Sequence, residues 1–197
     1  MYVQIIEGRT RDAAAMKRQA AKWNTDVRPG AIGFLGATSG ITADGRAITV
    51  ARFESEQAAR ANASRPEQSA WWAAMAKHYD GDVSFTESSD VDQFLAGGSN
   101  DAGFVQVMKS RGVNRSLIAR LDSEFMKFSN LRPDIIGGTR VWTGPDSCVD
   151  INYFTSEAAA RAGENQPMPP ELQSMMAEFQ DVMKNTEFFD FTDPQMM

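Results

Sequence analysis

Cysteine and histidine are almost missing from this sequence. Among its 197 residues, Cys148 is the one cysteine and His78 is the one histidine. A single cysteine excludes an intrachain disulfide and a zinc site built on cysteine pairs, and it fits a reducing, cytoplasmic location. Any haem or metal site that depends on imidazole would have to use His78, and no cluster of carboxylates has metal-ligand spacing. We therefore expect no metal site.

The sequence also lacks a long apolar run and an excess of basic residues. No stretch of roughly 18 apolar residues occurs, so we expect no transmembrane helix. The chain begins directly with a strand-like segment, so we expect no signal peptide. The formal net charge is −6, whereas nucleic acid and anionic membranes bind to concentrated basic surfaces. We expect neither as a partner.

What the sequence does contain is an internal repeat. Residues 53–61 (FESEQAARA) and 154–162 (FTSEAAARA) are identical at seven of nine positions, 101 residues apart. Each copy ends a β-branched run and begins an Ala-rich segment, which is typical of the junction between a strand and a helix. Ser55 is an expected N-cap of the first such helix.

The segments around the first copy predict the order strand, helix, strand, strand, helix, strand. The expected elements are a strand at 2–7, a helix that ends before Pro29, hairpin strands at 31–38 and 46–53, a helix after Ser55 that restarts at Pro66, and a strand at 83–87. The buried stripe of the second helix is expected to include Trp71, Trp72, Met75 and Tyr79.

The same order then repeats. The expected elements are a strand at 104–108, a helix with its stripe at Ile118, Leu121, Phe125 and Phe128, hairpin strands at 135–143 and 147–154, a helix that restarts at Pro169 with its stripe at Leu172, Met175, Met176, Phe179 and Met183, and a strand at 188–192. Met175 and Met176 thus correspond to Trp71 and Trp72. We expect a first repeat at 1–90, a Gly/Ser/Asp-rich linker at 91–103 and a second repeat at 104–197.

Each half therefore has the ferredoxin-like order βαββαβ, and the fold class is α+β. A four-stranded sheet with both helices on one face leaves its other face bare. A fused second copy supplies the cover, so we expect the two halves to form an intramolecular pseudo-dimer that closes into one α/β barrel. Association beyond that is left open.

The halves resemble the dimeric α/β-barrel superfamily, and most closely its antibiotic-biosynthesis-monooxygenase branch. The resemblance lies in the aromatic-x-Ser-Glu-x-Ala pattern at 53–58 and 154–159. It implies a cofactor-independent monooxygenase that acts on an aromatic or polyketide-like small molecule, in which the substrate itself activates oxygen and the protein binds, orients and stabilises an anion. The alternative is a non-catalytic protein of the same fold that binds a small molecule or is structural.

The haem-degrading branch of that superfamily is a weaker match. The resemblance to it would need a first-strand asparagine, a tryptophan and an axial histidine, but Gln4 and Asn62 stand at or near the first two positions. His78 alone survives the comparison. We therefore expect no haem and no other cofactor, although His78 is kept as one candidate catalytic residue beside its interpretation as a partly exposed residue at a helix end.

Two mid-strand amides, Gln4 and Gln106, occupy equivalent positions of the two first strands. Desolvating an unpaired amide costs about 1–3 kcal/mol, so each needs a partner if it is buried. Each amide therefore either bonds to a neighbouring group or lines a cavity between sheet and helices.

The second hairpin carries the other candidate ligand-binding residues. Counting back from its turn pairs Trp142 with Cys148 and Arg140 with Asp150, and Asn152 follows on the same face. Counting back in the first half aligns Gly36 with Arg140 and Thr38 with Trp142, and the other corresponding residues are Ala47, Thr49 and Ala51. The Arg140–Asp150 pair is either structural or part of an asymmetric pocket, with Arg140 holding an anionic or carbonyl oxygen and Asp150 as the second candidate catalytic residue. Cys148 is expected to be a buried, unreactive side chain.

Overall fold

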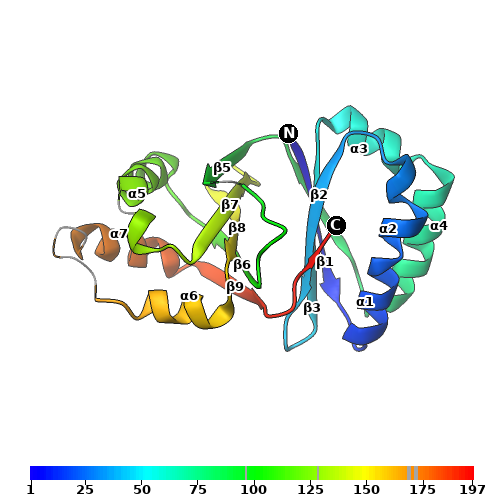
Figure 1. Cartoon of the computed structure of the whole chain (residues 1–197). Coiled ribbons are helices and arrows are strands. Elements are labelled where there is room, and N and C mark those ends of the chain that lie inside the picture. The colour runs from blue at the N-terminus through cyan, green and yellow to red at the C-terminus, as the bar shows by residue number, and fades with distance from the viewer. Residues whose placement is uncertain (96, 128, 168–169, 171–172) are drawn as a thin grey trace. The chain divides into compact units, whose positions relative to one another are not determined.

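Two five-stranded sheets organise the chain in the residues that the computed structural model describes, which are 1–95, 97–127, 129–167, 170 and 173–197. The first sheet belongs to a unit of residues 1–91 and 193–197, and the second to a unit of residues 92–192. In each unit the helices cover one face of the sheet (Figure 1). The α+β class with two tandem ferredoxin-like halves is therefore confirmed. Three predicted positions, Phe128, Pro169 and Leu172, lie outside the described residues.

The first unit follows the predicted order. Its elements are β1 (Tyr2–Arg9), α1 (Ala13–Ala21), α2 (Trp23–Asp26), a 3-10 turn (Arg28–Gly30), β2 (Phe34–Ile41), β3 (Arg46–Phe53), α3 (Glu56–Ala63), α4 (Pro66–Met75), a second 3-10 turn (Ala76–His78), β4 (Ser84–Ser88) and, from the end of the chain, β10 (Gln195–Met196). The strand order is β10-β2-β3-β1-β4.

The second unit repeats this order. Its elements are β5 (Val91–Leu95), β6 (Phe104–Arg111), α5 (Arg115–Lys127), a 3-10 turn (Ser129–Leu131), β7 (Ile135–Trp142), β8 (Ser147–Phe154), α6 (Glu157–Glu164), α7 (Gln173–Met183) and β9 (Thr186–Phe191). The strand order is β5-β7-β8-β6-β9. None of the helices in the described part of the chain combines the length and apolarity that a bilayer crossing needs.

The repeated segment forms the same cap in both units. Ser55 Oγ accepts a hydrogen bond from the backbone N–H of Ala58, and Ser156 Oγ accepts one from Ala159, each at 3.1 Å. A glutamate follows each serine in the first helical turn, where its charge favours the helix dipole. The repeat therefore begins one helix, α3 or α6, at the end of one strand, β3 or β8.

Each sheet contains a fifth strand that the sequence analysis did not predict. The segment expected to be a linker begins with β5, which lies beside β7. Residues 193–197 join the first unit, where Met197 exchanges backbone hydrogen bonds of 2.9 and 3.0 Å with Ala37. An edge strand offers a row of unpaired backbone groups, and a passing segment of any composition can pair with them. Composition alone therefore misread the start of the linker.

The hairpin register corrects one alignment. Arg140 lies opposite Asp150 and Trp142 opposite Cys148, which confirms the predicted pairing in the second hairpin. In the first hairpin, however, Ser39 lies opposite Thr49 and Ile41 opposite Ala47. The counterparts of Arg140 and Trp142 are therefore Ser39 and Ile41. The two hairpins have loops of equal length and a bulge at the same place. The offset of 101 residues between the repeats therefore holds throughout the hairpin, and the alignment with Gly36 and Thr38 was wrong.

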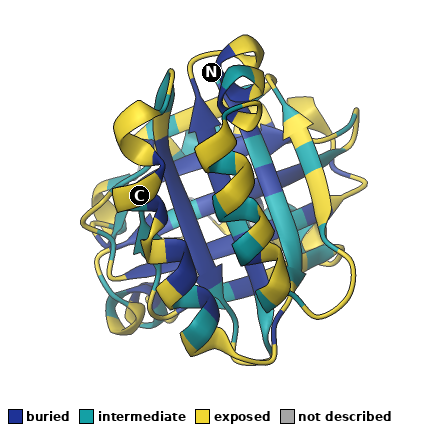
Figure 2. Cartoon of the chain, turned by 90° about the vertical axis from the view of Figure 1, so that its right-hand side faces the viewer, coloured by how far each residue is buried: buried dark blue, intermediate teal, exposed yellow. Residues whose placement is uncertain are grey.

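The space between helices and sheet in the first unit is filled by large side chains. Trp71, Trp72 and Tyr79 pack against a buried cluster that includes Met16 of α1 and Met75 of α4. In the view of Figure 2, the strands behind the helices are largely buried, whereas the outward faces of the helices are exposed. This filling matters for function, because the second unit is packed differently.

Candidate ligand-binding site

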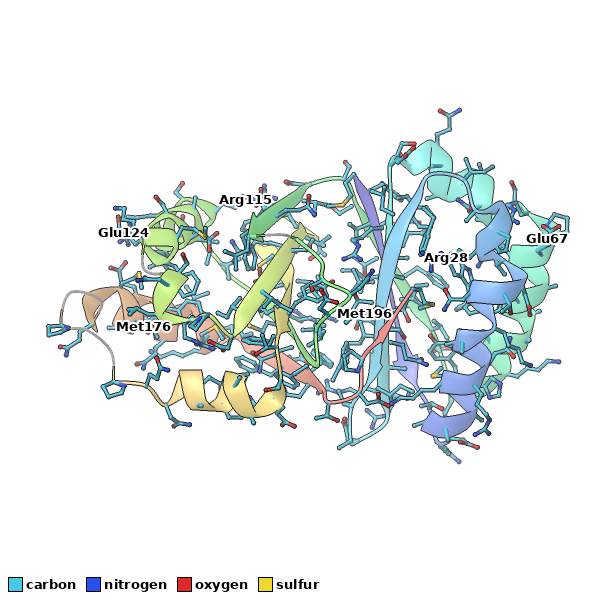
Figure 3. The ribbon with its side chains drawn as sticks, in the orientation of Figure 1. Arg28, Glu67, Arg115, Glu124, Met176 and Met196 are labelled. Carbon is cyan, nitrogen blue, oxygen red and sulfur yellow. The ribbon has the colours of Figure 1, made fainter. Side chains whose placement is uncertain are left out.

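The second unit contains a cavity of about 660 Å³ between its sheet and the helices α5, α6 and α7. This volume lies within the range of about 300–1,000 Å³ that is usual for small-molecule sites. The wall on the helix side is mostly apolar, and its apolar lining side chains from α5 and α7 are Ile118, Leu121, Phe125, Met175, Met176, Phe179, Val182 and Met183. Side chains of these helices extend toward the sheet in Figure 3, in which Met176 is labelled.

A substitution of side-chain type accounts for the difference between the two units. Trp71 and Trp72 of α4 pack with Tyr79, whereas the slimmer Met175 and Met176 of α7, with which the sequence comparison pairs them, pack with Leu121. A cavity of about 210 Å³ in the first unit is lined by residues of α1 and α2 and of the C-terminal segment. Core volume is therefore used for packing in one unit and left open in the other.

The sheet side of the large cavity carries a buried ion network centred on Arg140. Its Nε donates to Asp150 Oδ1 at 2.7 Å, and its Nη1 and Nη2 atoms donate to Asp122 of α5. Burial by itself would lower the pKa of Arg140, but the carboxylates of Asp150 and Asp122 outweigh burial and raise it. The guanidinium is therefore charged and fixed between a strand and a helix.

Asp150 is the most strongly perturbed carboxyl in this network. Burial raises its pKa to about 6, against the opposing effect of Arg140. The other carboxylate oxygen, Oδ2, accepts from Cys148 Sγ at 3.7 Å. Burial and the neighbouring Asp150 raise the pKa of the Cys148 thiol to about 12. Asp150 can therefore exchange a proton near neutral pH, whereas Cys148 stays a thiol, as predicted.

A second polar cluster in the cavity joins the predicted amide to a carboxylate. Gln106 Nε2 donates to Asp190 Oδ1 at 2.9 Å, and Asp190 also pairs with Arg161 of α6. In the first unit, Gln4 Nε2 donates to Glu87 Oε1 at 2.6 Å. The interpretation that each amide bonds to a neighbouring side chain is thus confirmed, and Gln106 lines the cavity as well.

Every arginine that lines the cavity is paired with a carboxylate. Arg140 pairs with Asp150 and Asp122, Arg161 with Asp190, and Arg132 with Asp134 at 2.8 Å. A guanidinium has five N–H groups, and three of those on Arg140 point to carboxylates. The two surrounding carboxylates disfavour an anionic ligand next to this guanidinium.

The sequence-predicted site residues do not all meet here. Gln106, Arg140, Asp150 and Asn152 line the cavity, and Asn152 Nδ2 lies 3.2 Å from Met108 Sδ. Trp142 is not a lining residue, but it packs in a buried cluster with Val113, Ile118, Cys148 and Val182, which do line the cavity. Gln4 and His78 belong to the first unit, with His78 half-buried in the 3-10 turn after α4. A catalytic role for His78, and the absence of haem or another cofactor, stay predictions.

Sequence reasoning missed several polar residues of the site, and three of them could have been found. Asp122 stands four residues after Ile118 in the predicted helix, so helical spacing already placed it on the cavity face. Arg161 lies inside the repeated segment, at the position of Arg60 in the first copy. Asp190 is opposite Gln106 in the sheet, as Glu87 is opposite Gln4. Within the described residues no group of three or more His, Cys, Asp or Glu is placed to hold a metal ion.

Comparison with known proteins gives matches of structure only. No family model matches the chain, and no curated protein matches it. A candidate monooxygenase from Lactobacillus acidophilus NCFM is 13% identical with a TM-score of 0.70, over 100% of this chain and 99% of the other. A candidate monooxygenase from Fusobacterium nucleatum subsp. nucleatum ATCC 25586 is 9% identical with a TM-score of 0.73, over 96% of this chain and 90% of the other.

A third solved structure, an anthrone oxidase-like protein, is 10% identical with a TM-score of 0.63, and the match covers 99% of this chain and 93% of that one. At these identities the likeness concerns the fold and not the activity. In fold, the chain is similar over its full length to candidate monooxygenases, which confirms the resemblance indicated by the repeat.

Proposed function

We propose that the cavity of the second unit binds a neutral, planar aromatic molecule that carries a carbonyl group, and that the protein oxidises it as a cofactor-independent monooxygenase. The observation that carries the proposal is the Arg140–Asp150 pair, a buried acid–base couple on the sheet side of a cavity that α5 and α7 line mostly with apolar side chains. Apolar side chains favour a flat ring system, and arginines that are already paired with carboxylates favour a neutral one.

The chemistry needs a base, a donor to an oxygen and molecular oxygen. Asp150 accepts a proton from a CH2 group next to the ring carbonyl, because its pKa of about 6 suits a base near neutral pH. The two remaining N–H groups of Arg140 stabilise the negative charge that develops on the carbonyl oxygen. The resulting carbanion is the electron donor, so no separate reductant is required.

The reaction balances with oxygen as the sole oxidant. The deprotonated carbon transfers one electron to O2, and the two radicals combine to form a C–O bond and a hydroperoxide. Loss of water then breaks the O–O bond and the second C–H bond and leaves a carbonyl group. One oxygen atom enters the product and the other leaves as water, so CH2 and O2 become C=O and H2O.

The full-length likeness to an anthrone oxidase-like protein supplies a test compound, because anthrone has such a CH2 group between aromatic rings. We expect wild-type protein to consume oxygen with anthrone and to form anthraquinone in equal amounts. We expect Asp150→Asn to lower kcat about 100-fold or more, which is the usual contribution of general-base catalysis. The matched control is Thr49→Ala, because Thr49 holds the position of Asp150 in the first hairpin.

A non-catalytic binding protein is the second candidate. It is favoured by the way in which Asp122 and Asp150 already engage Arg140, since such a network can be purely structural. Saturable binding of anthraquinone without oxygen uptake on any tested anthrone would support this function and refute the enzyme. Equal anthrone turnover by wild type and Asp150→Asn would refute the proposed role of Asp150.

A further inference from the structure

Strand β5 belongs to the sheet of the second unit but not to the βαββαβ repeat. It lies at the edge of the sheet beside β7. Asp92 at its start accepts a 2.8 Å hydrogen bond from the indole Nε1 of Trp142. Phe94 near its end contributes its side chain to the lining of the cavity. One wall of the candidate site therefore comes from a segment that precedes the repeat.

Two glycines of β7 make room for this segment. A Cβ on Gly138 would lie 1.8 Å from the Phe94 ring, and a Cβ on Gly137 would lie 2.0 Å from the carbonyl oxygen of Gly97. With Phe94 and Gly97 in these places, neither Gly137 nor Gly138 has room for a side chain. In the first repeat Ala37 stands at the position of Gly138, so the missing methyl group is specific to the unit that receives Phe94.

The backbone adopts a left-handed conformation directly after Phe94. Leu95 has a φ of 53°, in the left-handed region, and among the described residues it is the one non-glycine with a positive φ. The Gly97 N–H then bonds to the Phe94 carbonyl oxygen at 3.0 Å and closes a turn. A left-handed leucine costs on the order of 1 kcal/mol and persists where surrounding contacts determine it. The Phe94 ring is thus held against Gly138 between the strand and this turn.

We infer that Phe94 is a specificity-determining residue, which limits the length of the ring system that the cavity accepts. The inference rests on the proposed function only in requiring that the cavity binds aromatic ligands. Replacing the ring by a methyl group lengthens the cavity over Gly138, and replacing it by an indole shortens the cavity. Phe94 needs no contact with the reacting atoms for this role.

The test compares ligands of increasing length on matched variants. The probes are 1-naphthol, anthraquinone and a neutral four-ring tetracenequinone, with dissociation constants from tryptophan quenching. For Phe94→Ala we expect the ratio of four-ring to two-ring dissociation constants to fall about tenfold, and for Phe94→Trp we expect it to rise by a similar factor. Gln93→Ala is the control, because Gln93 is exposed on the same strand and does not line the cavity.

A second measurement checks the contact without any ligand. Gly138→Ala should lower the midpoint of thermal unfolding in wild type, because the added methyl group clashes with the Phe94 ring. It should have little effect in the Phe94→Ala background, where that ring is absent. Equal loss in both backgrounds would overturn the inference. So would an unchanged ligand ratio in Phe94→Ala that binds the probes with a normal circular dichroism spectrum. If wild type binds none of the probes, the proposed function fails and this inference fails with it, whereas binding with an unchanged ratio overturns the inference alone.

Discussion

Arg140 and Asp150 lie opposite each other on β7 and β8, and their side chains are joined by a 2.7 Å contact between Nε and Oδ1. The same positions of the first hairpin hold Ser39 and Thr49, whose hydroxyl oxygens are 2.9 Å apart. A neutral hydrogen bond in one repeat thus corresponds to a buried ion pair in the other. The difference places charge at the cavity of the second unit and leaves the first sheet uncharged at this position.

Breaking this pair from one side should destabilise the protein strongly. Arg140→Met leaves Asp150 buried without its cation, so we expect a loss of about 3–5 kcal/mol in the free energy of unfolding. The double variant Arg140→Met with Asp150→Leu should recover most of that loss, because no buried charge remains at the position. Urea unfolding of the four members of the cycle measures both. A double variant no more stable than Arg140→Met would contradict the proposed cause.

Ligand affinity should depend on Arg140 and not on its counterpart. In protein that remains folded, Arg140→Ala should weaken binding of anthraquinone by about 1.5–3 kcal/mol, the scale of a hydrogen bond from a charged group. Ser39→Ala is the matched control and should leave the affinity unchanged. Titration by ligand fluorescence measures both, and the idea of an asymmetric site is wrong if the two variants bind equally well.

Because the pKa of Asp150 is raised in the folded protein, the free energy of unfolding should depend on pH. Its pKa is about 6 in the folded protein against 3.8 as the ordinary value, so the folded state binds a proton more tightly than the unfolded state. This group therefore stabilises the fold fully below about pH 4, and its contribution is lost as the pH rises through about 6. The unfolding free energy of wild type minus that of Asp150→Asn should fall by on the order of 2–3 kcal/mol across this window. A flat difference from pH 4 to pH 7 would exclude the shift.

The Cys148 thiol should be unreactive in the native protein. Burial raises its pKa to about 12, and the thiolate is the reactive form. We expect a disulfide reagent such as dithionitrobenzoate to label Cys148 at least about 100-fold more slowly at pH 8 than it labels the urea-unfolded chain. The absorbance of the released thionitrobenzoate follows both reactions. Comparable rates would show that the thiol is open to solvent.

Exchanging tryptophan and methionine should move the open volume from one unit to the other. Met176→Trp places a large ring in the wall of the second cavity, so it should abolish binding of anthraquinone while leaving the protein folded. Trp72→Met removes a ring that packs against Tyr79 and Phe85, so it should cost about 2–4 kcal/mol of stability without affecting binding. Calorimetry of both variants checks the two effects. Retained affinity in Met176→Trp would mean that the ligand lies elsewhere.

The sequence by itself determined the repeated elements of this protein. The Ser-capped junction after residues 53 and 154, the alternation of the strands and the Arg140–Asp150 pairing are local patterns with a fixed period, and side-chain direction follows from that period. Arg161 and Asp122 were within reach of the same reasoning, through the repeat and through helical spacing from Ile118.

Only the tertiary structure decided where the open volume lies and which segments complete the sheets. The pairing of β5 with β7, and of β10 with β2, is made by backbone groups that every residue carries, so composition does not mark it. A cavity is a small difference between the space enclosed by the elements and the volume of the side chains that fill it. The exchange of Trp72 for a methionine was visible in the sequence, but whether Phe94 or another side chain would occupy the remaining space depends on packing between distant parts of the chain.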